Sequence, residues 1–166
     1  MASTYEPIAS QTLGSDTAEV TFSSIASSWT DLVVIGLLDF TSSGVALWVR
    51  FNGDTGSNYS YTVLTGNGSS AASARGSSQT QALVGFPNWG GSTAQDNLTI
   101  IQVMSYANTN VYKTLLHSSA LASQGVHRGV SLWRDTSAIS SLTLRVNSGS
   151  IATGSVISLY GIRGEL

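Results

Sequence analysis

The chain has 166 residues and a net charge of −2, and it is 42% hydrophobic but only 10% charged, with no cysteine. This balance argues against nucleic-acid binding, which needs a basic surface, and the lack of cysteine excludes disulfides and thiolate metal sites. The longest apolar run, residues 32–38, is far shorter than the ~20 residues that a transmembrane helix needs, so no membrane span is expected.

The low charge predicts a surface that other chains cover. An ordinary soluble domain has about 25% charged residues, which help to keep it in solution. The centres of protein–protein interfaces, by contrast, are depleted in charge. Here the single lysine is Lys113, and the polar residues are mostly Ser, Thr, Asn and Gly. The first residues lack the basic and apolar regions of a secretion signal, so we expect assembly in a reducing cytoplasm.

A chain of this length is expected to form one domain with its own core. Residues 1–13 are expected to form an extended N-terminal arm that contains the first strand, and residues 14–166 a single β-domain. Alternation of apolar and polar side chains predicts the strands. In chain order they fall at 5–13, 18–23, 31–39, 44–51, 58–65, 79–86, 97–106, 111–118, 126–134, 139–146 and 154–163.

Most of these strands have one apolar and one polar face. Val45, Leu47 and Val49, for example, alternate with more polar neighbours, which suits an antiparallel sheet with one buried face. Residues 32–38 and 98–104 differ, because they are apolar on both faces. They are expected to be central strands, or strands whose outer face meets another subunit.

The fold class predicted by this pattern is all-β. Turn dipeptides such as Asn52-Gly53 and Asn67-Gly68 separate many short strands. Such spacing is typical of an antiparallel β-sandwich of the jelly-roll type, with about 8–11 strands and little helix. The one helix candidate is a single turn within residues 23–29.

Residues 66–78 are low in sequence complexity, with Gly, Ser and Ala throughout. The first interpretation is a long surface loop, since loops of this length are often functional or mobile. The second is a loop that becomes ordered against a neighbouring subunit, with Arg75 as its one anchoring charge. Both interpretations predict an irregular segment.

The residues that support hydrolytic chemistry are few. His117 and His127 both lie in predicted strands, and serines are abundant. However, no Gly-x-Ser-x-Gly motif exists, and an all-β chain lacks the strand-to-helix turn that this motif requires. We therefore expect surface or interface histidines and no catalytic triad. A histidine at a subunit contact would make assembly pH-sensitive.

The sequence gives equally weak support to carboxylate catalysis and to metal binding. Nearly all acidic residues fall at predicted strand ends or turns, where they accept hydrogen bonds from backbone amides. A glycosidase needs two carboxylates about 5–9.5 Å apart across a cleft, and Asp54 and Asp135 are the acids to test. Residues 52–58 resemble the start of a calcium loop, but Ser57 and Val63 stand where Gly and Glu are needed. A hairpin turn is favoured, and no catalytic residue, cofactor or metal is assigned.

The aromatic residues suggest one contact region. Trp133 is expected in the core. Phe86 and Trp89 lie in a predicted loop, 86–91, where they either pack against another subunit or plug the local core. Contact with a glycan is a weaker alternative for this loop.

Several segments together resemble a known group of proteins. They are residues 5–13, 49–59, 66–70, 131–140 and 154–162. Over essentially the whole chain, the sequence resembles small virion structural proteins of tailed phages, especially aquatic and cyanobacterial ones. The motifs are turns and strands rather than catalytic signatures, so the resemblance implies no catalytic residue. Proteins of this kind are capsid decoration (cement) proteins or tail and fibre components, often trimeric jelly rolls.

The resemblance implies a homotrimeric decoration protein that binds the major capsid protein. It would be assembled in the host cytoplasm and lie on the capsid surface of the virion, without nucleic-acid or membrane contacts. The alternative is a tail-fibre or receptor-binding protein that recognises host surface glycan through exposed aromatics such as Trp89 or Tyr59. A carbohydrate-cleaving enzyme is a third hypothesis. The candidate interface residues are Tyr5, Ile8, Arg75, Phe86 and Trp89.

Overall fold

The computed structural model describes residues 5–88 and 97–163, and this part of the chain contains strands and no helix. The strands are β1 (Glu6–Thr12), β2 (Glu19–Phe22), β3 (Asp31–Leu38), β4 (Val45–Phe51), β5 (Tyr59–Gly66), β6 (Ala71–Gln79), β7 (Ala82–Asn88), β8 (Asn97–Val103), β9 (Lys113–Leu121), β10 (Gly125–Trp133), β11 (Leu142–Val146) and β12 (Val156–Ile162). The predicted all-β fold class is confirmed.

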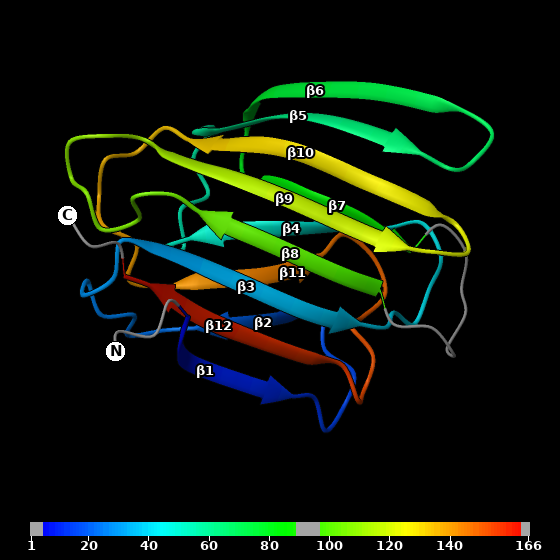
Figure 1. Cartoon of the computed structure of the whole chain (residues 1–166), viewed down its shortest axis with the longest axis horizontal. Coiled ribbons are helices and arrows are strands. Elements are labelled where there is room, and N and C mark those ends of the chain that lie inside the picture. Colours follow the sequence, from blue (N-terminus) through cyan, green and yellow to red (C-terminus); the bar gives the residue numbers. More distant parts are fainter. Residues whose placement is uncertain (1–4, 89–96, 164–166) are drawn as a thin grey trace.

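The strands form two antiparallel sheets packed face to face. The larger has the order β1-β12-β3-β8-β9-β10-β5-β6, and the smaller has the order β2-β11-β4-β7. Figure 1 shows the larger sheet in front, from β1 at the bottom to β6 at the top, with the smaller sheet behind it. The chain crosses repeatedly from one sheet to the other, which is the connectivity of a jelly-roll sandwich.

The core lies between the two sheets, because strands with two-residue alternation bury every second side chain. Phe51, Tyr59 and Trp133 are buried there, and their rings pack with centroids 5.4 Å apart (Phe51 and Trp133) and 6.2 Å apart (Tyr59 and Trp133). The core position predicted for Trp133 is confirmed. The Tyr59 hydroxyl also accepts a hydrogen bond from the Phe51 backbone N–H, so this aromatic group joins the two sheets.

The two doubly apolar segments become neighbouring strands inside the larger sheet. β3 and β8 pair directly, with Leu37 opposite Leu98 and Ile35 opposite Ile100. Their expected central position is confirmed. Their second face points away from the core, because Leu37, Leu98 and Ile100 are each about 40% exposed or more.

The predicted loop at 66–78 is wrong: most of it is strand β6. The Asn67 N–H donates to the Ser70 carbonyl, which closes a two-residue turn and places β6 antiparallel to β5. Gly68 has a φ of +86°, and a positive φ at the first central position is what a type II′ hairpin turn uses. Small side chains do not prevent a strand here, because the neighbouring strand supplies the backbone hydrogen bonds.

The helical turn expected within residues 23–29 is also wrong. Ser24 has a left-handed φ of +57°, which a right-handed helix cannot contain. Instead, the segment is an irregular connection that hydrogen bonds attach to other parts of the fold. The Ile25 N–H donates to the Ser140 carbonyl, and the Trp29 indole N–H donates to the Glu6 carboxylate at 3.0 Å.

Residues 5–12, from the expected N-terminal arm, belong to the sandwich itself. β1 pairs along its length with β12 and forms one edge of the larger sheet. The pairing shifts by one residue between Pro7 and Ala9. This part of the predicted arm is therefore an edge strand of the same domain.

Candidate functional site

The solvent-facing side of the larger sheet carries most of the exposed apolar surface. Of the ten large apolar side chains that are exposed in the described residues, seven lie on this side: Leu37, Leu64, Leu98, Ile100, Leu116, Val126 and Val130. They come from β3, β5, β8, β9 and β10, which lie side by side in the sheet. Scattered exposed leucines are ordinary, but a contiguous group usually marks a contact surface.

The sheet register places these side chains in rows. Leu37 lies opposite Leu98, Leu98 opposite Ala120, and Ala120 opposite Val126. We call the whole surface the outer face. It consists of the outward side chains Ile35, Leu37, Leu98, Ile100, Gln102, Leu116, Ser118, Ala120, Val126, Arg128, Val130, Thr62 and Leu64. Arg128 is the one charged member of this set, and Asp31 lies at its margin, where its carboxylate accepts a hydrogen bond from the Gln102 amide, so the surface carries few charges.

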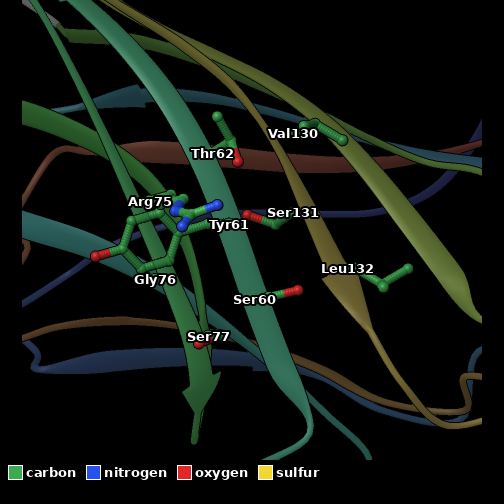
Figure 2. Close-up of a pocket in the computed structure, with 9 residues that line it drawn as sticks. All are labelled: Ser60, Tyr61, Thr62, Arg75, Gly76, Ser77, Val130, Ser131 and Leu132. Carbon is green, nitrogen blue, oxygen red and sulfur yellow. The ribbon is translucent and has the colours of Figure 1, made fainter.

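Two shallow grooves mark the outer face. One has a volume of about 420 Å³ and runs along β5, β6 and β10, where Thr62, Arg75 and Val130 lie at one level of the register. Figure 2 shows its lining residues on these three strands. The second, of about 260 Å³, lies across β8, β9 and β10 and includes Leu116 and Arg128. Both grooves are open and mix hydroxyl groups, aliphatic carbons and one arginine each, without an acidic group.

The predicted interface residues do not form one cluster. Tyr5 is 50% exposed and packs edge-on against Tyr160, with ring centroids 6.2 Å apart. Ile8 packs partly buried against the protein's own core. Arg75 is exposed on β6, beside the first groove. Phe86 lies in β7, but its side chain and the whole of Trp89 are outside the described part of the structure.

The expected surface or interface histidines are instead buried in the core. His127 is fully buried and His117 is 3% exposed, and the two rings stack with centroids 5.4 Å apart. They project inward from β9 and β10, toward β7 of the smaller sheet. Burial and the neighbouring histidine lower the pKa of His117 to about 3, and burial lowers the pKa of His127 to about 4. Both rings are therefore neutral at physiological pH.

The hydroxyl groups near this pair do not make a hydrolytic site. Ser131 lies 3.4 Å from His117 Nε2, but its hydroxyl also meets the Leu83 carbonyl at 2.8 Å and the side chain is 1% exposed. A substrate cannot reach a serine in this position without opening the sandwich. The hydrogen bond from Ser131 in β10 to Leu83 in β7 instead holds the two sheets together.

The single lysine is buried as well. Lys113 is fully buried, and its ammonium group donates to the backbone carbonyls of Asn108, Val111 and Thr136 at 2.7 to 3.0 Å. Burial lowers its pKa, and Asp135 opposes that shift. Three carbonyl acceptors satisfy all three ammonium donors. The lysine therefore links the connection between β8 and β9 to the connection between β10 and β11, and it contributes no charge to the surface.

The hairpin predicted at residues 52–58 is wrong, because β4 and β5 lie in different sheets and do not pair. The segment is instead a turn that leads from one sheet to the other, and its local hydrogen bonds explain its oxygen-rich sequence. The Asp54 carboxylate accepts hydrogen bonds from the Gly56 N–H, the Asn58 amide and the Trp133 indole, at 2.7 to 2.9 Å. Burial raises the pKa of Asp54, but these hydrogen bonds outweigh it and the net shift is downward. Asp135 likewise accepts from the Ser137 N–H. Both acids act as structural acceptors within turns.

Sequence reasoning found the apolar outer positions of β3 and β8 but not the complete outer face. Leu116, Val126 and Leu64 were not singled out, because each lies in a strand that the sequence marks only by alternation. Only the sheet order brings these three strands beside β3 and β8.

Comparisons with known proteins identify no family. No protein-family model and no curated protein sequence matches the chain. Among solved structures, the Caenorhabditis elegans galectin LEC-6 is 10% identical, with 93% of this chain and 96% of that chain covered and a TM-score of 0.41. Scytalido-glutamic peptidase, in complex with a peptide-based transition-state analog, is 12% identical, with 95% and 66% covered and a TM-score of 0.24. At these scores neither likeness bears on what the chain binds or does.

Proposed function

We propose that this protein is a virion structural protein of a tailed phage, a capsid decoration protein that acts as a homotrimer on the major capsid protein. The observation that carries the proposal is the outer face, a broad apolar surface with a single charge at its centre. The sequence resemblance described above supplies the phage context. A charge-poor surface of this kind is costly to expose and is suited to permanent coverage.

The energetics favour a multivalent contact. Covering one half-exposed leucine or valine contributes about 1 kcal/mol. Association has to offset several kcal/mol of lost translational and rotational freedom. A single pair of outer faces would therefore bind modestly, whereas a closed oligomer that touches several shell subunits gains avidity from each extra contact. Holding neighbouring shell subunits together would oppose the outward pressure of packaged DNA.

One residue that the tail-fibre alternative expects to contact a glycan is not exposed. Tyr59 is fully buried beside Trp133 and cannot stack on a sugar. Trp89, the other aromatic named for this role, lies outside the described residues. Glycan recognition therefore enters only as an outcome of the test below.

The test is the number and place of copies on purified phage particles. A decoration protein is expected in hundreds of copies on the head, and particles stripped of it are expected to lose heat resistance. Adding the purified protein back should restore that resistance. A few tens of copies confined to the tail, or binding to host surface glycan with no effect on head stability, would contradict the proposal and favour a receptor-binding role.

A further inference from the structure

The free edge of β6 differs from the other edges of the two sheets. β6 ends the larger sheet, and β7 of the smaller sheet packs against β8, β9, β10 and β5, so β6 projects beyond the smaller sheet. Figure 1 shows β6 at the top of the molecule, with no described strand beyond it. Nearly all residues of β6 are exposed.

The other edges carry features that block strand addition. β1 contains Pro7, a shift in pairing, and Glu6, which forms an ion pair with Arg163 at 3.0 Å. β2 has only four residues and begins with a charged one, Glu19. β7 contains Pro87. Proline, charge, irregular pairing and shortness are the usual protections of an edge strand. β6 has nine residues, no proline, and Arg75 as its single charge, and its pairing with β5 is irregular only at its end, between Gly76 and Gln79.

The hairpin fixes which backbone groups of β6 are available. The bond from Asn67 N–H to the Ser70 carbonyl makes this pair a hydrogen-bonded one, and such pairs alternate along an antiparallel ladder. The pairs Thr65–Ala72 and Val63–Ala74 are therefore also hydrogen-bonded. It follows that Ala71, Ser73 and Arg75, which occupy the alternate positions, direct their N–H and C=O groups away from β5 and toward the free edge.

We infer that β6 pairs with β6 of a second copy of this chain, antiparallel about a twofold axis at Ser73. In this register Ala71 lies opposite the partner's Arg75, and Ala72 lies opposite the partner's Ala74. Small side chains therefore face each other or face the arginine. A register centred on Arg75 would instead place two like charges opposite each other, which is unfavourable. The charge pattern of β6 thus disfavours a register centred on Arg75.

This pairing would join the two larger sheets into one continuous sheet. Residues 71, 73 and 75 alternate with 72 and 74, so their side chains continue the outer face from β5, where Leu64 lies opposite Ser73. The apolar outer faces of two copies would then form one longer surface. The β6–β6 contact does not use the outer face, so its test does not depend on the proposed function.

Engineered cysteines test the twofold axis directly, because the natural chain has no cysteine. In the full-length protein, Ser73→Cys would place two sulfur-bearing residues in a hydrogen-bonded pair, with Cα atoms about 5.5 Å apart. That separation is within the range of a disulfide. Ala71→Cys is the matched control, because its two copies would be about 14 Å apart, four residues along the strand.

After mild oxidation, Ser73→Cys is expected to give at least about tenfold more disulfide-linked dimer than Ala71→Cys, since residues with Cα atoms more than 7 Å apart cannot be bridged. Mixing Ala71→Cys with Arg75→Cys should produce the mixed dimer, although Ala71→Cys does not link to itself. Circular dichroism confirms that each variant is folded. No dimer from folded Ser73→Cys, or equal cross-linking of Ala71→Cys alone, would overturn the inference. Copy number on phage particles would be unaffected by either result.

Discussion

At the scale of single residues, the stacked histidines make stability depend on pH. The pKa of His117 is lowered to about 3 and that of His127 to about 4, whereas an unfolded chain has histidine pKa values near 6.5. Below pH 6.5 the unfolded state therefore binds protons that the folded state excludes. By linkage, the free energy of unfolding falls as pH falls through this window, and the loss levels off only near pH 3 to 4.

We therefore predict a loss of stability between pH 6.5 and pH 5. The expected loss is roughly 2 kcal/mol for each histidine at pH 5, from 1.4 kcal/mol per pH unit. Urea unfolding at a series of pH values measures it. The pKa values of Glu6 and Asp54 are lowered, so these acids weaken the fold only at lower pH. His127→Gln should show a clearly shallower slope in the same window, and an unchanged slope would contradict the assignment.

Residues that look functional in the sequence have structural partners here. Asp54, in an oxygen-rich turn, holds the indole of Trp133, and Lys113 holds three carbonyls inside the fold. Neither role is visible in the sequence, because Trp133 lies 79 residues from Asp54 and Thr136 lies 23 residues from Lys113. The turn at residues 52–58 was predictable, since Asn, Gly and Asp favour local hydrogen bonds.

At the scale of elements, the β5–β6 hairpin depends on its turn. Gly68 has a φ of +86°, and a side chain in that conformation costs roughly 1–2 kcal/mol. Gly68→Ala is therefore expected to lower the free energy of unfolding by about 1 kcal/mol or more, measured by urea unfolding. Gly14→Ala is the control, because nothing lies within 4 Å of the added carbon. Equal effects of the two substitutions would show that the turn does not hold the hairpin.

β6 is also the strand that the sequence pattern did not predict. Its residues are mostly Ala, Ser and Gly, so no apolar alternation marks it as a strand. A strand does not need that alternation when it buries almost nothing and receives its hydrogen bonds from one neighbour. β3 and β8 were predictable because their continuous apolar runs suit strands with both faces covered or in contact.

At the scale of the whole molecule, the outer face is expected to hold copies together. Leu116 lies on this face and is 50% exposed, so Leu116→Lys should leave the fold intact while adding an ammonium group to the contact. Light scattering is expected to give an oligomeric mass for the wild type and a lower mass for this variant. Tyr112→Lys is the control, because Tyr112 is similarly exposed but lies between β8 and β9 rather than on the outer face.

A monomeric wild-type protein would contradict this expectation, as would a Leu116→Lys variant with unchanged mass. The two proposed contacts are tested by separate measurements. Leu116→Lys is expected to disrupt contacts made by the outer face, whereas disulfide formation by Ser73→Cys detects contact between two β6 edges. Loss of one with retention of the other would show which contact builds the assembly.

The sequence by itself determined the all-β class, the antiparallel sandwich and the shortage of surface charge. These are local or compositional properties: alternation sets which side chains share a face of a strand, and charge content sets how a surface interacts with water. Sheet order, the burial of His117, His127 and Lys113, and the gathering of leucines and valines on one face were decided only by the tertiary structure. Each depends on which strands become neighbours, and pairing between distant segments leaves no mark in either segment alone.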